Sequence, residues 1–393
     1  MICVAEEARA IGRKVAEWRR HFHRYPELSF KEFETTRMIA EILKGAGIYD
    51  CKIGVSGIPT GLVVDMAGGL GAGRCVALRA DIDALPLDEE ANVSYRSENA
   101  GVMHACGHDA HIAMLLGAAL LIKNHEHEFK GRIRLIFQPS EEAGDGGAKP
   151  MIEEGVLNGV DNIAALHVWQ PLDAGRFAFV RNTTMASSDK FEIYVRGRGG
   201  HGAYPHQTVD PVLTAASIVC QLQGIVSREI DPLDTGVISV CSIHSGTASN
   251  VIPEVAIIEG TVRALTPEMR TQLHAGIARM AGCTAEAHRC EAEVRVLNGY
   301  PPTVNESTSL ERAVRIAGEI VGVGCVIEQK PSMGAEDMGF YLERIPGCYL
   351  YLGGGSKEKN CVYPHHNPKF DIDDEVLHLG SAFLAAYALD FLR

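Results

Sequence analysis

The segment between residues 185 and 300 has a different pattern from the chain on either side of it. Up to residue 184, short apolar runs such as "TGLVVDMAG" and "RCVALRADID" alternate with stretches of helical spacing, and this alternation returns after residue 301. Such alternation is typical of an α/β sheet whose chemistry lies where strands run out into loops. Within 185–300, "DKFEIYVRGRGG", "TGVISVCSIHSG" and "EVAIIEGTVRAL" predict antiparallel strands, accompanied by helices at 208–227 and 267–282. We therefore expect an α/β fold of two domains, one built from residues 1–184 and 301–393 and the other inserted at 185–300.

The composition limits the classes of protein that this chain can represent. Its 393 residues are too many for one ordinary core, which also favours two domains. A formal charge of −13 with no basic block argues against a nucleic acid or an anionic membrane as partner. No 18 apolar residues run together, so no membrane span is expected. The 11 cysteines are scattered without a C-x-x-C pair, and the first residues lack a signal-peptide core, which favours reduced thiols in the cytoplasm.

Apolar spacing and polar flanks predict several helices. Residues 5–24 and 32–44 show helical periodicity. The run "DAHIAMLLGAALLIKNH" predicts a buried helix with Asp109 as its N-cap. An amphipathic helix is expected at 374–392, and the pair Glu336–Asp337 is interpreted as a helix cap rather than as a catalytic group.

Four polar clusters interrupt the apolar pattern, namely "HACGHDAH", "QPSEEAGDGG", "ALHVWQP" and "YPHHNPKF". Thiolates, imidazoles and carboxylates are the usual ligands of zinc and related ions. Cys106, Glu141, Glu142 and His167 fall at predicted strand ends. Adjacent strand residues point to opposite faces, but at a strand-to-loop corner both glutamates can reach one cavity, one binding metal while the other handles a proton. Each cluster alone also fits a buried thiol, a structural histidine or a solvated acidic face; together they favour a metal site.

Ordered motifs along nearly the whole chain resemble one family. They are "RHFHRYPELSFKEFET", "LRADIDALPL", "MHACGHDAHIAMLLGAA", "IFQPSEEAGDGGAKPMIEEG", "ALHVW", "GRGGHGAYPH", "ASNVIPE", "GTVR", "MGAEDM" and "HNPKF". The chain resembles the aminoacylase/carboxypeptidase family of dinuclear-metal peptidases, in the branch of N-acyl-amino-acid amidohydrolases, hippurate hydrolases and plant auxin-conjugate hydrolases. The resemblance implies a catalytic domain with a mixed sheet and an inserted, smaller α+β (ferredoxin-like) domain that serves as lid and dimerisation domain.

The resemblance also implies a metal centre and a general base. Two divalent metal ions per subunit are held by Cys106, His108, Glu142, His167 and His366, and the general base is Glu141. The ligand position two residues before the proline favours His366 over its neighbour His365. A thiolate ligand favours zinc, while manganese, cobalt and nickel are alternatives.

Other residues of the motifs are expected to support the metal ligands. The wider superfamily often has a histidine ligand in an H-x-D-x-x-P stretch, where this chain has Asp81 in "DIDALP". Asp83 is then a candidate to orient a metal ligand, and either aspartate has strand-end capping as its alternative. His104 and His111 match the motif without a ligand role, and we expect them to support the ligands or to pack the helix.

Three residues of the inserted domain have roles by resemblance. His201, which the sequence alone would make a turn histidine, is placed over the active site of a partner subunit, where it holds the carbonyl oxygen. Asn250 and Arg263 resemble the family's contacts to the free carboxylate of the substrate. An arginine fork can grip both oxygens, and the alternative for Arg263 is a salt bridge on the strand face. A homodimer, or a tetramer, is therefore expected.

The activity implied is hydrolysis of the amide bond of N-acyl-L-amino acids to a carboxylic acid and a free amino acid, with Glu141 as general base on a metal-bound water. A metallocarboxypeptidase or dipeptidase acting on short peptides is the alternative, because both reactions need a free carboxylate beside the scissile amide. A Cys106 thiol hydrolase would leave Glu142, His167 and His366 without a role. A serine hydrolase is disfavoured because "GVSG" lacks the G-x-S-x-G spacing. A non-catalytic, metal-stabilised binding protein would leave Glu141 unexplained.

Overall fold

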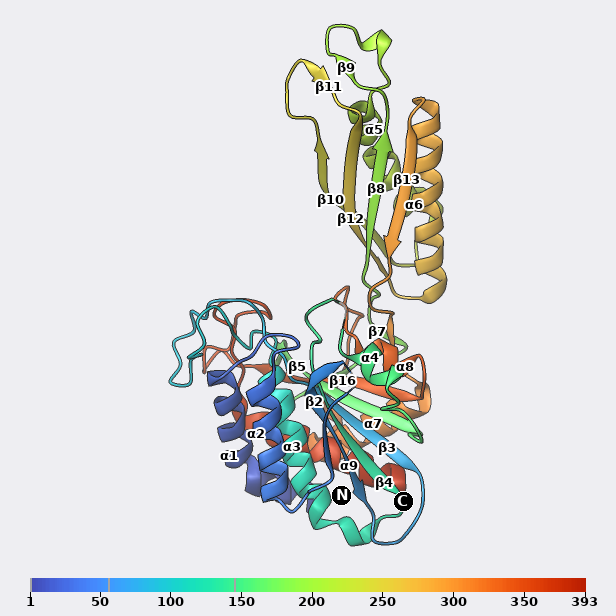
Figure 1. Cartoon of the computed structure of the whole chain (residues 1–393). Coiled ribbons are helices and arrows are strands. Elements are labelled where there is room, and N and C mark those ends of the chain that lie inside the picture. The colour runs from blue at the N-terminus through green and yellow to red at the C-terminus, as the bar shows by residue number, and fades with distance from the viewer. Residues whose placement is uncertain (1, 56, 145) are drawn as a thin grey trace. The chain divides into compact units, whose positions relative to one another are not determined.

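A computed structural model describes residues 2–55, 57–144 and 146–393 of the chain. The chain divides into two compact units, each with its own hydrophobic core (Figure 1). The first unit comprises Met1–Thr184, Val304–Lys330 and Asp337–Arg393, and the second comprises Met185–Thr303 and Pro331–Glu336. The first unit is therefore built from both ends of the chain, and the second is inserted into it.

The first unit is organised around one mixed sheet of eight strands in the order β1-β2-β4-β3-β5-β16-β6-β15. The strands are β1 (Cys51–Val55), β2 (Ile58–Ala67), β3 (Cys75–Asp81), β4 (Arg132–Gln138), β5 (Asn162–Asp173), β6 (Phe177–Phe179), β15 (Val326–Glu328) and β16 (Gly347–Gly355). β4, β3, β5 and β16 run parallel at the centre, whereas β1 and β2 pair antiparallel at one edge. Two short strands, β7 (Thr183–Met185) and β14 (Thr303–Val304), form a separate ladder.

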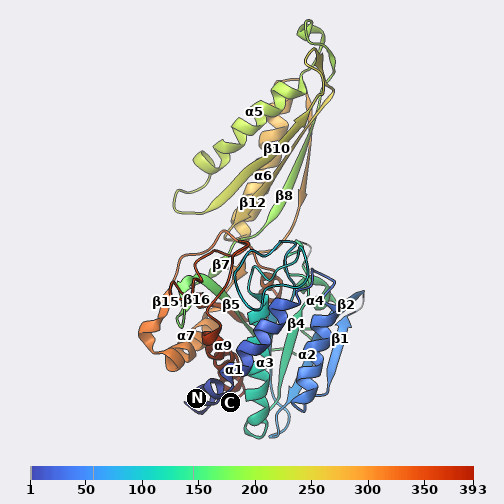
Figure 2. The same cartoon turned by 90° about the vertical axis from the view of Figure 1, so that its left-hand side faces the viewer.

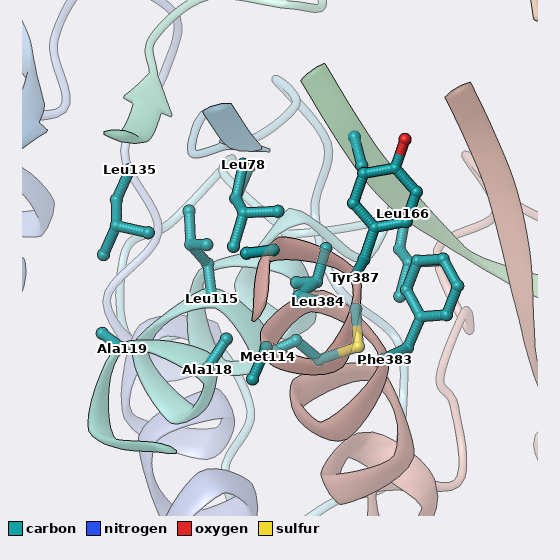
Figure 3. Packing of buried hydrophobic residues seen from close by; sticks show 14 of the residues in the cluster. Leu78, Met114, Leu115, Ala118, Ala119, Leu135, Leu166, Phe383, Leu384 and Tyr387 are labelled. Carbon is teal, nitrogen blue, oxygen red and sulfur yellow. The ribbon is translucent and has the colours of Figure 1, made fainter. Parts of the chain in front are cut away.

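Helices cover this sheet. They are α1 (Ile2–Arg24), α2 (Phe33–Gly45), α3 (His108–Asn124), α4 (Ala148–Glu153), α7 (Ser307–Val321), α8 (Met338–Leu342) and α9 (Leu377–Leu392). α1, α2 and α3 lie side by side (Figure 1), and α3 and α9 pack against each other and against β3. Figure 3 shows Leu115 of α3 and Leu384 of α9 close to Leu78 of β3, inside the main core. Burial of one such leucine contributes about 2 kcal/mol, so the helix–sheet contact is a large part of the stability of this unit.

α9 is buried on nearly all sides. The prediction of a helix at 374–392 therefore holds, but the prediction that this helix is amphipathic is wrong. Buried residues occupy every face of it, because it lies between α3, α7 and the sheet. The segment Asp374–Leu392 is long and apolar enough to cross a membrane, but 72% of it is buried inside the chain. A mostly buried apolar helix of this kind is a core helix.

The second unit has the element order β-α-β-β-α-β. Its elements are β8 (Asp189–Arg196), α5 (Pro211–Gly224), β10 (Gly236–Ser245), β12 (Val255–Ala264), α6 (Pro267–Ala287) and β13 (Glu291–Leu297), with a small ladder of β9 (Gly200–His201) and β11 (Val251–Ile252). The antiparallel sheet has the order β10-β12-β8-β13, the ferredoxin-like arrangement. α5 and α6 pack together on the sheet (Figure 2), and the alternating burial of β8 fits a sheet covered on one face.

The prediction that Asp109 caps its helix is wrong, and the Asp337 side chain does not cap the helix that it precedes. α3 begins at His108 with Gly107 as its N-cap, so Asp109 lies inside the first turn and its carboxylate binds Arg19 and His23 instead of capping. Asp337 precedes α8 but its side chain makes no capping hydrogen bond. It accepts hydrogen bonds from Arg79 and Gln138 of the sheet and from the backbone N–H of Ala148, the first residue of α4.

Candidate metal centre

The candidate site lies where central parallel strands of the first unit end. β3 ends at Asp81, β4 ends shortly before Glu141 and Glu142, and α3 begins at His108. The carboxyl ends of neighbouring parallel strands meet at one edge of a sheet, so the loops that follow them lie together. His167 was predicted at a strand end but lies inside β5, which continues for six more residues to its end. Its ring still reaches the cluster, because β5 is the neighbour of β3.

The structure brings the five predicted ligands together as two groups that share Cys106. Ligand-capable atoms of Cys106, His108 and His167 lie within 4.8 Å of one another, and so do those of Cys106, Glu142 and His366. The Cys106 Sγ is 3.5 Å from His167 Nε2, and Glu142 Oε1 is 3.2 Å from His366 Nε2. Bonds of about 2.0–2.3 Å from zinc to nitrogen or sulfur fit atoms at these separations. The arrangement offers two sets of candidate metal ligands that have the Cys106 sulfur in common.

Two histidines present their Nε2 atoms to this cluster. The Nδ1 of His108 lies 3.0 Å from the carbonyl oxygen of Asp83 and 3.2 Å from its carboxylate, and the Nδ1 of His167 donates to the carbonyl oxygen of Val168. A proton on Nδ1 leaves the lone pair on Nε2. The Nε2 of His108 is buried and has no hydrogen-bond partner among the residues that the structure describes. A buried nitrogen in this state suits a cation.

A glycine brings the start of α3 close to β5. Gly107 has a φ of +88°, and a Cβ at this position would lie 2.4 Å from the Val168 side chain. Any other residue would therefore push His108 away from the strand that carries His167. The glycine of "HACGHDAH" is required by the geometry of the cluster itself.

The structure distinguishes His366 from His365. His366 has a φ of +64°, and its backbone N–H donates to the carbonyl oxygen of Ala105 at 2.8 Å, which fixes it beside the Cys106 loop. A left-handed backbone at a non-glycine residue stores strain and is often found at functional sites. His365 instead accepts a hydrogen bond from the backbone N–H of Gln170, and burial lowers its pKa to about 3. Only His366 reaches Glu142.

Asp83 connects a ligand histidine to the glutamate turn. Besides its contacts to His108, its carboxylate accepts the backbone N–H groups of Glu141 and Glu142 at 3.0 Å each and the hydroxyl of Ser29 at 2.6 Å. Burial disfavours the charge of Asp83, but His108, followed by Ser29 and the Glu142 N–H, holds its pKa below the ordinary value. Asp83 thus fixes the positions of residues from two different loops.

Asp81 takes a comparable position beside His111. Its carboxylate binds the Arg79 guanidinium at 2.7 Å and His111 Nδ1 at 2.5 Å, and His111 Nε2 accepts the N–H of Val168. Both ring nitrogens of His111 are therefore used, which leaves no lone pair for a metal. His104 is also buried and lies outside the ligand groups.

Without a cation, the site holds its thiol in the protonated form. Burial, followed by the nearby Glu142 and Glu141 carboxylates, raises the pKa of Cys106 well above its ordinary value. Burial opposes the charge of His108, but Asp81 and Asp83 raise its pKa to about 10. Carboxylates around a thiol stabilise a cation in place of its proton, whereas a nucleophilic cysteine needs an electropositive environment. This electrostatic setting disfavours the thiol hydrolase.

The predicted substrate residues lie at two ends of the second unit. His201 pairs with Val251 in the β9–β11 ladder, next to Asn250, whose carbonyl oxygen accepts the N–H of Gly202. Arg263 lies near the other end of β12, a strand of ten residues that spans roughly 30 Å. His201 and Asn250 are exposed, and Arg263 is partly buried. This unit by itself therefore does not bring Arg263 together with the other two residues.

Arg263 forms no salt bridge among the described residues, although the Asp189 carboxylate is near enough to favour its charge. Its Nη1 donates to the Val262 carbonyl oxygen and to the Thr261 hydroxyl, and burial lowers its pKa from the ordinary value. The predicted alternative of a strand-face salt bridge is not observed for it. A guanidinium that is partly buried and unpaired is suited to receive an external carboxylate.

Sequence reasoning missed three residues that support the site, of which Glu32 and Arg79 are buried and Ser29 is partly buried. Glu32 accepts the N–H of Ser140, Ser29 donates to Asp83, and Arg79 joins Asp81 to Asp337. Glu32 and Ser29 lie in the motif "PELSFKE" and Arg79 lies in "LRAD". Membership of these motifs was therefore the sequence signal that could have pointed to them. Their partners lie far away in the sequence, which is why local patterns did not identify them.

Comparison with known proteins places the chain in a family. A model described as peptidase family M20/M25/M40 matches residues 77–390. The chain therefore belongs to this family of peptidases, and its structure brings together two groups of candidate metal ligands that share Cys106.

Relatives cover nearly the whole chain. Thermostable carboxypeptidase 1 of Saccharolobus solfataricus is 42% identical over 385 residues, covering 96% of this chain and 96% of the relative. N-acetyl-L-cysteine deacetylase of Bacillus subtilis is 40% identical over 366 residues, covering 93% and 85%. A crystal structure of a Bacillus subtilis protein described as a dinuclear metal binding peptidase of the M20 family has a TM-score of 0.86 at 34% identity, covering 98% of each chain.

Proposed function

We propose that this protein is a metal-dependent amidohydrolase that cleaves N-acyl-L-amino acids to a carboxylic acid and a free amino acid. The observation that carries this proposal is the pair of ligand groups that share Cys106, with Glu141 beside them. The Glu141 carboxylate lies 4.0 Å from His108 Nε2 and is largely buried. Family membership and the deacetylase relative support the same reaction class.

The proposed ligands of two divalent cations are Cys106, His108, Glu142, His167 and His366. Bound metal ions lower the pKa of water towards neutrality and polarise the acyl carbonyl group. Sulfur and imidazole ligands favour zinc, with manganese as the main alternative. In this proposal Glu141 accepts the proton of the attacking water and delivers it to the departing amine.

Recognition of the substrate is assigned to residues of the second unit. Arg263 binds the free carboxylate of the amino acid, supported by its unpaired and partly buried guanidinium, and Asn250 is a second contact. His201 stabilises the carbonyl oxygen. Because His201 and Asn250 lie at the opposite end of the sheet from Arg263, we propose that they act in the site of a partner subunit, with the second unit as lid and dimerisation domain of a homodimer. A strictly monomeric and fully active enzyme would contradict this arrangement.

A metallocarboxypeptidase acting on short peptides is the second candidate. The 42% identity to a thermostable carboxypeptidase favours it, and the same carboxylate contacts serve both reactions. We propose the cytoplasm as the location, because the ten cysteines that the structure describes are all free thiols.

The test is release of free amino acid from N-acetyl-amino acids, N-benzoyl-amino acids and dipeptides. The protein is assayed as purified, after chelation, and after addition of zinc, manganese or cobalt. We expect activity that disappears with chelation and returns with metal, with N-acyl-amino acids as the best substrates. Faster cleavage of dipeptides would favour the carboxypeptidase, and activity indifferent to chelation would overturn the metal mechanism.

A further inference from the structure

A buried carboxylate outside the ligand groups contacts the turn that carries Glu141. Glu32 is fully buried, and its Oε1 accepts the backbone N–H of Ser140 at 2.9 Å. Its Oε2 accepts the hydroxyl of Thr60 at 2.7 Å. Burial of an isolated carboxylate is costly, so both oxygens need such donors. Glu32 therefore joins β2 to the residue immediately before the catalytic glutamate.

Glu32 lies at a position where a side chain ordinarily caps a helix, but its carboxylate binds Thr60 and Ser140 instead. Glu32 occupies the N-cap position of α2, yet its side chain makes no capping hydrogen bond. The free N–H groups of Glu34 and Thr35 are bound instead by the carboxylate of Glu27, at 3.2 and 2.8 Å. Because Glu27 satisfies the start of the helix, the Glu32 side chain is available to reach across to β2 and the β4 loop.

The turn that receives Glu32 is strained and held from two sides. Ser140 has a φ of +56°, in the left-handed region that non-glycine residues avoid. Such a conformation persists only where the surroundings impose it. Three consecutive N–H groups are bound by two buried carboxylates: Glu32 takes that of Ser140, and Asp83 takes those of Glu141 and Glu142.

We infer that Glu32 is a positioning residue for Glu141, holding the Ser140 peptide so that the base carboxylate meets the attacking water. The inference rests on the proposed role of Glu141. Asp83 also contacts His108, so it acts on the metal ligands as well as on the turn, whereas Glu32 contacts no proposed ligand. A displacement of a catalytic group by about 1 Å can reduce the rate about 100-fold. Loss of Glu32 is therefore expected to reduce turnover more than metal binding.

The experiment compares three variants of the full-length enzyme loaded with its metal. Glu32→Ala removes both acceptors, Glu32→Gln keeps one amide oxygen for the Ser140 N–H, and Glu34→Ala removes a nearby exposed carboxylate that binds Arg37 and not the turn. We expect Glu32→Ala to lower kcat about 10- to 100-fold, with KM changed by less than about 3-fold and unchanged metal content. Glu32→Gln should recover most of kcat, and Glu34→Ala should keep it within about 2-fold. Equal losses in Glu32→Ala and Glu34→Ala, or loss of metal from Glu32→Ala, would overturn the inference.

Amide hydrogen exchange tests the contact independently of activity. Peptides that contain residues 140–142 should exchange at least 10-fold faster in Glu32→Ala than in the wild type, and at the wild-type rate in Glu34→Ala. Unchanged exchange in Glu32→Ala would reject the positioning role even if kcat falls. An inactive wild type with this exchange pattern would instead contradict the proposed function and leave the Glu32 contact established.

Discussion

Cys106 is the one residue that belongs to both proposed ligand groups, and its thiol is protonated when no cation is present. Replacing it should therefore affect both cations, whereas replacing His366 should affect one. We expect Cys106→Ala to retain close to no tightly bound metal per subunit and His366→Ala to retain about one ion. Elemental analysis of the dialysed proteins measures this. Two ions in Cys106→Ala would contradict the shared position of the sulfur.

We assign Glu141 the transfer of a proton and no part in holding the metal ions. Glu141→Ala should therefore bind metal as the wild type does, while kcat falls by about 10²- to 10⁴-fold, the usual effect of removing a general base. Metal content and steady-state kinetics of the same preparation test both parts. The exposed Glu153 of α4 provides a control, since Glu153→Ala should change neither quantity. Near-normal turnover in Glu141→Ala would reject the assignment.

The buried Glu32 carboxyl group lowers the free energy of unfolding by an amount that depends on pH. Burial and the nearby Asp83 raise its pKa from the ordinary 4.5 to about 7. The folded protein then holds a proton that the unfolded chain releases, so the contribution of Glu32 to stability is lost as pH rises from about 4.5 through 7. We expect metal-free Glu32→Gln to gain stability relative to the wild type over this range, by up to about 3 kcal/mol at pH 8. Urea unfolding at pH 5 and pH 8 measures the difference, and a pH-independent difference would contradict the shifted pKa.

At this scale, the sequence predicted the proposed ligands, which the structure brings close together, but not the residues that hold them in place. Cys106, His108 and Glu142 lie in motifs whose chemistry is visible locally. Glu32 could not be identified because its partner Ser140 lies more than a hundred positions away, and only the fold brings the two together.

At the scale of elements, α1 is joined to α3 by a buried ion pair. Arg19 binds Asp109 of α3 at 2.8 Å and also Asp371, which follows the His366 loop, at 2.8 Å. Removing one partner leaves buried charge unpaired, so Arg19→Met should lower the free energy of unfolding by about 3–5 kcal/mol. Arg13→Met, which removes only an exposed pair with Glu17, should change it by less than about 0.5 kcal/mol. Denaturant unfolding compares the two, and equal effects would contradict a structural role for the buried pair.

Element predictions succeeded where periodicity was strong and failed where burial overrode local preference. The predicted helix at 5–24 corresponds to α1, and the predicted strand runs before Cys106 correspond to β2 and β3. Asp109 was expected to cap α3 because aspartate favours that position. The buried Arg19 and His23 provide stronger partners than the free amides of a helix end, and no local pattern contains them.

At the scale of the whole molecule, the second unit is stabilised by ion pairs of one buried carboxylate. Asp189 at the start of β8 binds Arg270 and His274 of α6, and these donors hold its pKa near 2 despite the opposing effect of burial. Since the ordinary value is 3.8, this stabilisation is present above pH 3.8 and is lost as pH falls through about 2. Asp189→Asn should therefore destabilise the protein at pH 7 by about 3 kcal/mol, with a smaller difference at pH 2. Calorimetry at both pH values measures this, and an equal difference at both would exclude the ion pair as the cause.

The order in which the first unit is assembled determines when its metal centre can form during synthesis. β16 lies between β5 and β6 in the sheet, and His366 follows it, so both emerge from the ribosome after the whole second unit. At about 5–20 residues per second, the roughly 200 residues between His167 and His366 take on the order of ten to forty seconds to translate. During that interval the nascent chain carries Cys106 and three other proposed ligands without the fifth. The second unit can fold first, and acquisition of the full metal complement becomes one of the last steps in the production of the enzyme.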